Sequence, residues 1–308
     1  MIEYDPPSAC LPLVLWWQTD GPIIEPVCLR FRSSRASVIG QGMRSFFSTP
    51  PPRIFGHRGA AGLAPENTLP SFALALALGA DVLELDVHGT RDGVVVVMHD
   101  DTVDRTTNGT GPVRDLTWRQ IEALDAGYHF TRDGRDFPFR GHGVQVPTFE
   151  SVLTTFPLAL CNVEIKENDG GLIDEVIALV RRLDAAARVI VAAEKGEILR
   201  HVRGHARELT TSFSAEDVAD FLGRVEANRW HDYTPPGIAL QVPPRFGTVE
   251  ILRREVIAAA HRLGLEVHAW TINDPDEMKE LWEKGVDGIV SDLPGLARVV
   301  ARRFTSGG

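Results

Sequence analysis

Cysteine is scarce in this sequence, and long hydrophobic runs are absent. The 308 residues include three cysteines, Cys10, Cys28 and Cys161, whose spacing matches neither a disulfide framework nor a metal-binding motif. We therefore expect reduced thiols in a cytoplasmic protein, with Cys161 buried in its apolar stretch. The early apolar run at residues 11–17 is too short to span a membrane, and no basic residue precedes it. Neither stable membrane insertion nor secretion is therefore expected.

Basic residues are outnumbered as well. There are 32 lysines and arginines against 42 aspartates and glutamates, which gives a formal net charge of -10. Nonspecific nucleic-acid binding needs a basic surface that displaces counterions from phosphates, so nucleic-acid partners are not expected. What is present, 44% hydrophobic and 24% charged residues, is typical of a soluble globular protein with a sizeable core. A small anionic substrate would then need a local basic pocket.

The first 52 residues differ from the rest of the chain. They mix proline, serine and arginine without a helical or strand period, and they end in three consecutive prolines at residues 50–52. We expect a poorly ordered extension or linker. An equally open alternative is that the natural chain starts at Met43. A short tail, residues 303–308, is expected at the other end.

Short apolar strands and amphipathic helices alternate from Arg53 onward, which predicts a parallel sheet. Eight strands fit a (β/α)8 TIM barrel over residues 53–302, and an open doubly wound sheet is the alternative. The predicted strands are residues 53–56, 82–87, 160–165, 189–193, 209–212, 238–242, 266–271 and 288–291. The predicted helices are residues 68–78, 149–156, 172–183, 197–205, 215–222, 249–263 and 276–284.

One interruption follows the second predicted strand. Residues 90–93 form a turn motif, TRDG, and the β-branched run at residues 94–98 follows too soon for a parallel crossover. These segments predict a hairpin within an insertion over residues 90–147, between the second strand and the second helix. The hairpin would carry His99 back toward the end of the second strand, at the barrel mouth.

Acidic residues lie two positions apart in the second strand, Glu84 and Asp86, and Glu164 with Lys166 repeats this spacing in the next strand. Residues at i and i+2 share one face of a strand, here the barrel interior near its C-terminal mouth. Buried carboxylates repel each other unless a cation intervenes, which predicts a site for Mg²⁺ or Ca²⁺. The alternatives are an exposed acidic pair on an edge strand and a simple ion pair between Glu164 and Lys166.

Two histidines lie near these carboxylates in the predicted barrel: His57, which follows the first strand beside Arg58, and His99. Each imidazole titrates near neutrality and can act as a general acid or base. The Arg58 guanidinium suits a phosphate oxygen pair. A lone histidine in a loop is more often a surface residue, so this prediction depends on the carboxylates beside it.

Other polar residues have weaker claims to a role. Glu66 and Asn67 begin the first helix, where capping alone would explain them, although Asn67 could also donate to a bound phosphate. Trp270 ends a strand and could line the pocket or simply pack. His88 is expected to face away from the carboxylates, and His268 is a weak candidate for the pocket rim.

A series of short motifs carries a resemblance to a known family: HRG at 57–59, PENT at 65–68, ELDV at 84–87, DG at 92–93, HD at 99–100, RTTNG at 105–109, VPT at 146–148, EIK at 164–166, WTIN at 270–273 and GIVSD at 288–292. Their order resembles the glycerophosphodiester phosphodiesterase family over about residues 53–300. The stretch 189–246 is less typical, because Ala193-Glu194 stands where the family more often has Ser-Phe.

The resemblance implies a TIM barrel with an insertion after its second strand, and it implies roles for individual residues. These are metal ligands at Glu84, Asp86 and Glu164, acid–base histidines at His57 and His99, and phosphate contacts at Arg58 and Lys166. The resemblance also favours Trp270 as a substrate contact, and Asn67 is kept as a further one because its amide could donate to the phosphate.

The expected activity is metal-dependent hydrolysis of a small-molecule glycerophosphodiester to glycerol phosphate and an alcohol, with one Ca²⁺ or Mg²⁺ ion as cofactor. His57 is favoured as the base and His99 as the acid of the first step. Two alternatives stay open. One is a lysophospholipase D-type enzyme that grips a longer lipid with Phe130, Phe137 and Phe139 of the insertion, and the other is a noncatalytic barrel that binds a phosphodiester. No oligomeric state is predicted.

Overall fold

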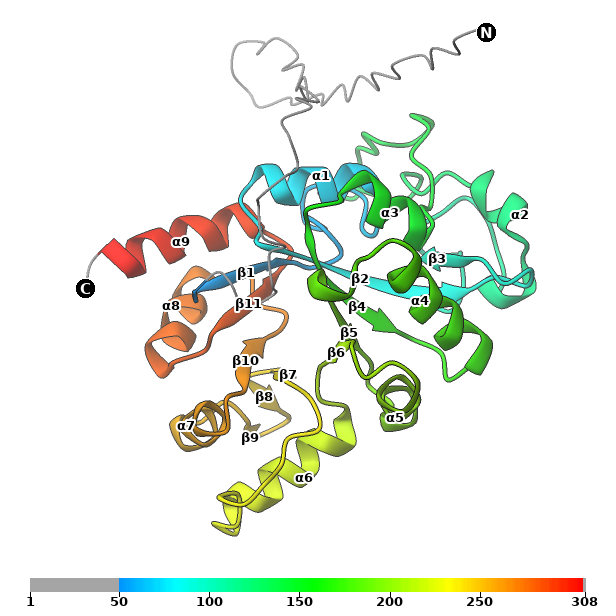
Figure 1. Ribbon diagram of the computed structural model, residues 1–308. Helices are drawn as coiled ribbons and strands as arrows, with labels where there is room; N and C mark the ends of the chain where they lie inside the picture. Colours follow the sequence, from blue (N-terminus) through cyan, green and yellow to red (C-terminus); the bar gives the residue numbers. More distant parts are fainter. Residues whose placement is uncertain (1–49, 307–308) are drawn as a thin grey trace, which may run out of the picture. The chain divides into compact units, whose positions relative to one another are not determined.

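The computed structural model describes residues 50–306, so the predictions for residues 1–49 and for the last two residues lie outside it. Eight parallel strands form the centre of this part of the chain (Figure 1): β1 (Arg53–Gly56), β2 (Val82–Gly89), β4 (Leu160–Ile165), β5 (Val189–Ala192), β6 (Thr210–Thr211), β7 (Ala239–Val242), β10 (Glu266–Ala269) and β11 (Gly288–Ser291). They pair in the order β6-β5-β4-β2-β1-β11-β10-β7. A bridge between Ser212 and Ala239 brings the two ends of this order together. The strands therefore form a nearly closed TIM barrel, and not an open doubly wound sheet.

Helices connect the successive strands: α1 (Leu69–Ala77), α3 (Phe149–Thr155), α4 (Gly170–Arg182), α5 (Gly196–His205), α6 (Ala215–Glu226), α7 (Arg254–Arg262) and α8 (Pro275–Lys284). A further helix, α9 (Pro294–Ser306), ends the described part of the chain. Polar side chains fix where several of them begin. The Asp169 carboxylate accepts a hydrogen bond from the Leu172 amide at the start of α4, and Asp274 caps α8 in the same way. The last helix, α9, follows the final strand and was not among the predicted helices.

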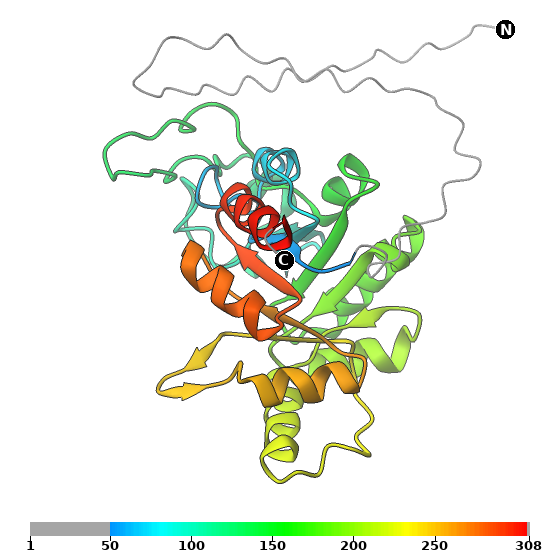
Figure 2. The ribbon, with the colours of Figure 1, turned by 90° about the vertical axis from the view of Figure 1, so that its left-hand side faces the viewer.

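One predicted helix begins later than the sequence indicated. The pattern over residues 249–263 predicted a helix throughout, but α7 begins at Arg254. The preceding residues form an antiparallel hairpin of β8 (Arg245–Phe246) and β9 (Val249–Glu250), which projects from the barrel in Figure 2. Gly247 has a φ of 58°, a left-handed conformation that suits glycine and lets the chain reverse here.

The insertion after β2 contains the predicted hairpin and has a small core of its own. β3 (Val95–Val97) pairs antiparallel with β2, which confirms the hairpin. A short helix, α2 (Trp118–Glu122), contributes Ile121 to an apolar cluster that also includes Val96, Met98, Val103, Val113, Ala126, Val144 and Val146. Because this cluster is separate from the clusters beneath the barrel helices, the insertion packs as a subdomain that is attached to β2.

The phenylalanines of the insertion are engaged with each other and with an arginine. Phe130 packs edge to face against Phe139, with ring centroids 5.3 Å apart. Phe137 lies 3.8 Å from the Arg140 guanidinium. None of the three lines the large pocket described below. Their position outside this pocket gives no support to the hypothesis that these rings grip an acyl chain, which stays a prediction.

The main hydrophobic core lies between the strands and the surrounding helices, where outward-facing strand residues such as Leu83, Leu85 and Val163 are fully buried. Cys161 is buried in the same cluster, as expected. The barrel interior contains polar residues as well. At the N-terminal ends of the strands, Arg53 pairs with Glu266 at 2.6 Å.

His268 continues the polar contacts inside the barrel. Its Nε2 lies 3.0 Å from Glu266 and its Nδ1 lies 3.2 Å from Gln241, while the ring packs on Phe55. The side chain is completely buried. His268 is therefore an interior residue of the barrel and not part of the pocket rim, where the sequence had made it a weak candidate.

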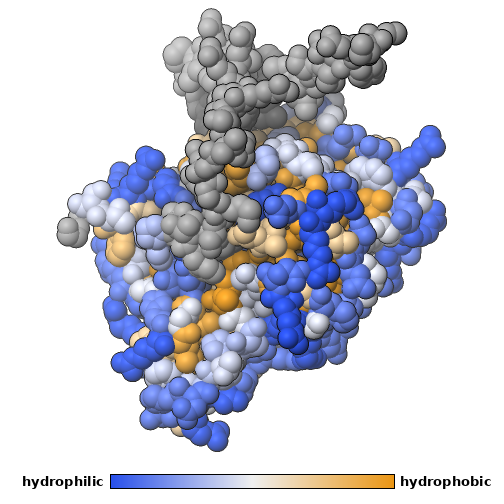
Figure 3. All heavy atoms as spheres, in the orientation of Figure 1, coloured by the Kyte–Doolittle hydropathy of each residue, from blue (hydrophilic) through white to orange (hydrophobic). Residues whose placement is uncertain are grey.

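The face of the molecule seen in Figure 1 has hydrophilic residues along its margins and hydrophobic residues gathered nearer its centre (Figure 3). None of the helices within residues 50–306 combines the length and the apolar character needed to cross a membrane.

Candidate active site

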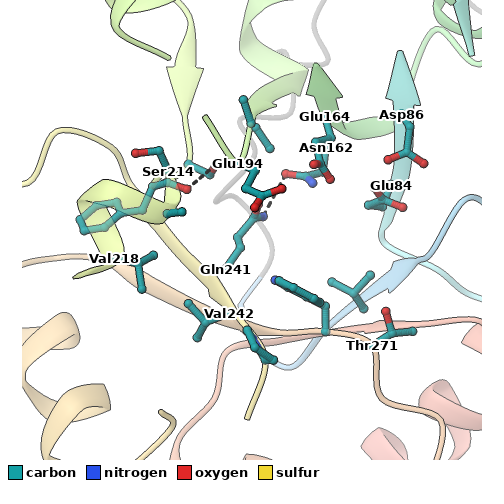
Figure 4. Close-up of a pocket in the computed structure, with 18 of the residues that line it drawn as sticks. Glu84, Asp86, Asn162, Glu164, Glu194, Ser214, Val218, Gln241, Val242 and Thr271 are labelled. Atoms are coloured by element: carbon teal, nitrogen blue, oxygen red, sulfur yellow. Dashed lines mark hydrogen bonds between the residues drawn. The ribbon is translucent and has the colours of Figure 1, made fainter. Parts of the chain in front are cut away.

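Three carboxylates meet inside the mouth of the barrel. Glu84 and Asp86 project from β2, and Glu164 lies beside Asp86 in the parallel register of β4. Their oxygens lie within 4.8 Å of one another. Figure 4 shows the three side chains together at one side of the pocket. Glu84 and Asp86 are 6% and 1% exposed, so the alternative of an exposed acidic pair on an edge strand is wrong.

Burial and mutual repulsion make full ionisation of these carboxylates unfavourable. Burial, together with the neighbouring charge of Asp86, raises the pKa of Glu84 to about 8. A divalent cation would relieve this repulsion, and a donor set made only of carboxylate oxygens suits Mg²⁺ or Ca²⁺. The three residues therefore fit one hard metal ion, and they are the one such acidic group found within residues 50–306.

Two basic side chains lie against the carboxylates. Lys166 Nζ is 2.8 Å from Asp86 and 2.9 Å from Glu164, so it bridges both residues and is not simply paired with Glu164. Arg58 Nε is 3.5 Å from Asp86. Burial lowers the pKa of Lys166, but attraction to the two carboxylates more than offsets it and the pKa is raised. Lys166 is therefore charged at neutral pH and can attract an anion into the cavity.

A tight turn after β1 fixes Arg58. Gly59 has a φ of 88°, and a Cβ there would lie 2.4 Å from the Ser71 hydroxyl, so the turn requires glycine. The Arg58 amide donates a hydrogen bond to Glu84 at 2.8 Å. Backbone and side chain of this residue thus both contact the acidic group, which explains why HRG occurs at this point in the sequence.

Asn67 contacts a carboxylate of the acidic group. It is buried, and its side-chain amide donates to Asp86 at 2.9 Å. The predicted phosphate contact of Asn67 stays a prediction, but the position of the amide gives it a second use, namely to orient Asp86. The neighbouring Glu66 pairs with Arg58 at 2.8 Å. Helix α1 begins directly after its N-cap, Thr68, so capping explains neither Glu66 nor Asn67.

His57 is held by a carboxylate from the neighbouring strand. Its Nδ1 lies 2.7 Å from Asp292, which in turn accepts a hydrogen bond from Asn273 at 2.6 Å. Burial disfavours the charged imidazolium, but the bond to Asp292 and the negative charge of Glu84 outweigh it. The pKa of His57 is therefore raised above its ordinary value.

His99 is held by a chain of ion pairs that crosses from the insertion to the barrel. Its Nδ1 lies 2.7 Å from Asp100, and Arg105 binds both Asp100 and Glu66 at 2.7 Å. Glu66 continues the chain to Arg58. The Arg105 guanidinium, despite partial burial of the pair, holds the pKa of Asp100 well below its usual range. Asp100 thus orients His99.

His88 corrects one step of the sequence argument. It lies two positions beyond Asp86 on the same strand, so alternation puts it on the same side of β2 and not on the opposite side, as expected. The ring is buried, with Nδ1 against Glu167 and Nε2 3.1 Å from the carbonyl oxygen of His99. His88 is therefore outside the acidic group but supports the end of the hairpin that carries His99.

One pocket of about 650 Å³ brings most of the predicted residues together. It is lined by eight of the nine predicted site residues: His57, Arg58, Glu84, Asp86, His99, Glu164, Lys166 and Trp270. Asn67, the ninth, lies behind Asp86. Trp270 is 45% exposed and contributes to the wall of the pocket. Two imidazoles, three carboxylates and two cations around one cavity can bind an anion and transfer protons to and from it.

Sequence reasoning missed the residues that hold the two histidines, chiefly Asp292 and Arg105. A usable pattern existed for Asp292. It directly follows β11, the neighbour of β1, and Ser291 is the register partner of Gly56, which precedes His57. A carboxylate at the end of a strand adjacent to a candidate catalytic histidine is therefore worth testing as its partner. Arg105 offered no comparable spacing, because its contacts cross between the insertion and the barrel.

Comparisons with known proteins agree with this geometry. The sequence pattern of the glycerophosphoryl diester phosphodiesterase family matches residues 57–296. A glycerophosphodiester phosphodiesterase of Caldanaerobacter subterraneus subsp. tengcongensis is 33% identical over 246 residues, which cover 78% of this chain and 94% of that protein.

Solved structures show the same architecture. The crystal structure of a glycerophosphodiester phosphodiesterase from Agrobacterium tumefaciens superposes with a TM-score of 0.66 at 32% identity, covering 80% of this chain and 99% of that one. A phosphodiesterase from Oleispira antarctica, solved in complex with the product sn-glycerol-3-phosphate, gives a TM-score of 0.64 at 25% identity, covering 83% of this chain and 99% of that one.

Proposed function

The chain belongs to the glycerophosphoryl diester phosphodiesterase family, and from this premise we propose that it hydrolyses glycerophosphodiesters to glycerol phosphate and an alcohol. The observation that carries the proposal is the single cavity lined by His57, His99, the acidic group and the two basic residues. The product found in the Oleispira antarctica enzyme, glycerol 3-phosphate, is the product that this reaction would release.

The charged groups would bind the phosphodiester. Arg58 and Lys166 offer positive charge to its oxygens, and both lie on the cavity wall. Glu84, Asp86 and Glu164 would hold one divalent cation, which when bound neutralises the charge that develops on the phosphoryl oxygens. The acidic group would otherwise repel an anionic substrate, so the basic residues and the cation are both needed at the same place.

The two histidines would move the protons. Asp292 and Asp100 would each accept a hydrogen bond from the Nδ1–H group of His57 and His99, which leaves each Nε2 available for proton transfer. His57 takes a proton from the nucleophile, either water or the adjacent glycerol hydroxyl of the substrate, and the oxygen of the nucleophile forms a bond to phosphorus. The P–O bond to the alcohol breaks, and His99 protonates the departing oxygen. If a cyclic phosphate forms first, the roles reverse when water opens it.

Turnover of glycerophosphocholine by the purified chain tests this proposal. We expect His57→Ala and His99→Ala each to lower kcat by about 10²- to 10⁴-fold, the usual contribution of a general acid or base. His201→Ala is the control, because that histidine pairs with Asp174 on an exposed surface. Retention of near-wild-type turnover by either catalytic variant would contradict the assignment.

Chelation tests the metal separately. EDTA is expected to abolish turnover, and added Ca²⁺ or Mg²⁺ is expected to restore it. The noncatalytic binding barrel makes the opposite prediction, since such a protein would bind glycerophosphodiesters and cleave none of them with either metal. Full activity in EDTA would be compatible with the proposed hydrolysis but would contradict its dependence on a metal.

A further inference from the structure

The pocket has a second half that the proposed chemistry does not use. Apolar residues line it on the side away from the acidic group, and they come from α6 and from the segment that includes β7 and the β8–β9 hairpin. In Figure 4, Val218 and Val242 lie on the opposite side of the pocket from Glu84 and Asp86. Phosphate binding does not account for this apolar surface, which adjoins the catalytic groups in the same pocket.

The apolar half is built from side chains that the fold leaves uncovered. Val218 and Leu222 lie one turn apart on α6 and are only partly buried, whereas Phe221 on the same helix is buried in the core. Phe246 of the hairpin lines the pocket and is 77% exposed. Val218, Phe221 and Leu222 belong to one apolar stripe of α6, whose inner part packs on the core and whose edge lines the pocket. An apolar edge that stays open to a cavity suits an apolar ligand.

Small residues keep the two halves connected. Ala192 and Ala193 line the pocket at the end of β5, between the acidic group on β2 and β4 and the start of α6, and the exposed Glu194 that follows them lines it as well. Their methyl groups leave room that a larger side chain would fill. A substrate whose phosphate lies at the acidic group can therefore extend toward Val218 and Phe246 within the same cavity of about 650 Å³.

We propose that this apolar half is a binding subsite for one unbranched acyl or alkyl chain of the substrate, and that Val218, Leu222 and Phe246 determine chain preference. The inference rests on the proposed hydrolysis and specifies its substrate class. A diester of glycerol with a small polar alcohol would leave the apolar wall in contact with water. A chain would cover that wall, and each methylene that it buries strengthens binding by about fourfold.

The hairpin identifies the open end of this subsite. β8 and β9 project from the barrel in Figure 2, and both Phe246 and Val249 are largely exposed there. The apolar surface thus continues outward from the pocket wall along the hairpin. A chain that is too long for the cavity leaves the pocket beside Phe246, so chain preference is expected to rise with length and then level off.

Matched substrates test the proposal and locate the chain. One series carries hexanoyl or decanoyl groups on the glycerol of glycerophosphocholine, and the other carries hexyl or decyl groups on the leaving alcohol of a glycerophosphodiester, all used as monomers in solution. We expect kcat/KM to exceed that of glycerophosphocholine by at least about tenfold in one series. The series that shows the gain identifies the end of the substrate that bears the chain.

Variants assign the gain to the subsite. Val218→Thr keeps the side-chain shape and adds a hydroxyl, and Phe246→Ser removes the exposed ring. Both are expected to reduce the chain-dependent gain by several-fold and to leave glycerophosphocholine turnover unchanged. Val299→Thr is the matched control, because Val299 is an exposed valine of α9 that does not line the pocket.

The outcomes separate this inference from the proposed hydrolysis. Cleavage of glycerophosphocholine without a chain-dependent gain in either series would overturn the subsite and leave the hydrolase intact. A gain that survives both variants would overturn the assignment to these residues. If no substrate is cleaved, the proposed function is wrong. The affinities of decanoyl-glycerophosphocholine and glycerophosphocholine, measured by calorimetry, then still decide whether the apolar half binds a chain.

Discussion

The two halves of the pocket are held in place by different forces. In the charged half, side chains from β2, β4 and the HRG turn are fixed by ion pairs, such as the contacts of Lys166 at 2.8 and 2.9 Å. In the apolar half, Val218 and Leu222 pack against the core beneath α6, whereas Phe246 is held by the backbone of the β8–β9 hairpin. Proton transfer and phosphate binding need donors at defined positions, whereas chain binding needs only volume and apolar contact. In the proposed function, the reaction and the substrate preference would thus depend on separate elements of one barrel.

Removing the bridging lysine tests this separation most severely. Lys166→Ala is expected to lower kcat by about 10²- to 10³-fold, because a preorganised charge opposite the developing negative charge is lost. If the halves act separately, the factor is the same for substrates with and without a chain. Steady-state kinetics with both kinds of substrate measure this factor. Lys279→Ala is the control, because Lys279 lies on the exposed face of α8. A loss of kcat confined to chain-bearing substrates would contradict the separate action of the two halves of the pocket.

The partner of His57 comes next in expected effect. Asp292→Asn is expected to lower kcat/KM by about a hundredfold, because the imidazole loses the acceptor that fixes its tautomer. His57 must be neutral to act as a base, and Asp292 raises its pKa, so the acidic limb of the kcat/KM profile should move to lower pH in the variant.

The contact between His57 and Asp292 should also make the folding stability depend on pH. A raised folded-state pKa means that the His57–Asp292 pair contributes its full stabilisation below the ordinary pKa of histidine, and that this contribution is lost as the pH rises through the raised value. Thermal unfolding of Asp292→Asn should therefore differ most from that of the native sequence at acidic pH. An unchanged pH–rate profile together with an unchanged difference in Tm would contradict the role of Asp292.

The ion-pair chain behind His99 should matter less. Arg105→Gln leaves Asp100 in place but removes its link to Glu66, and we expect about a tenfold loss in kcat, as for other residues that orient a functional group. Arg119→Gln, in α2 of the same insertion, is the control. Equal effects of the two substitutions would mean that the chain does not position His99.

Metal and pH should affect folding stability together. The pKa of Glu84 is raised to about 8, so the metal-free folded protein keeps a proton that the unfolded chain releases near its ordinary value of 4.5. Stability of the metal-free protein should fall as the pH rises through this window, because the unfolded state binds fewer protons. A divalent cation replaces the proton, and its stabilising effect should grow over the same window.

Calorimetry at several pH values measures this effect. At a hundredfold excess over Kd, a single bound ion is expected to raise Tm by about 5 to 10 °C. Glu84→Gln removes the titrating group, so both the pH-dependent fall and the gain from the metal should diminish in that variant. A gain in Tm that is equal at pH 5 and pH 8 would contradict the coupling between the metal and Glu84.

The two halves also differ in how well the sequence predicted them. The strands, the hairpin and the acidic group followed from period-two spacing, since Glu84 and Asp86 share a face for purely geometric reasons. The same rule applied correctly would have put His88 on that face. Its contacts with Glu167 and with the His99 carbonyl oxygen explain why the ring does not join the acidic group. The apolar half had no such pattern, because Val218 and Leu222 look like ordinary members of an amphipathic helix.

Tertiary contacts account for most of what could not be predicted. The Phe130 and Phe139 rings were given a lipid-binding role from composition alone, but their mutual packing satisfies them inside the insertion. The β8–β9 hairpin was hidden because Val249, Ile251 and Leu252 also fit a helical period. The supports of the histidines pair residues that are far apart in sequence, such as His57 with Asp292, and no local rule relates them.

The attachment of the insertion has a consequence for how activity is lost under stress. His57 belongs to the barrel, whereas His99 is carried by a subdomain whose small core is separate from the core beneath the barrel helices. Partial opening of that subdomain would withdraw one proton-transfer group while the barrel stays folded. Inactivation on heating or by limited proteolysis would then precede global unfolding, and hydrogen exchange in residues 90–147 would report it first.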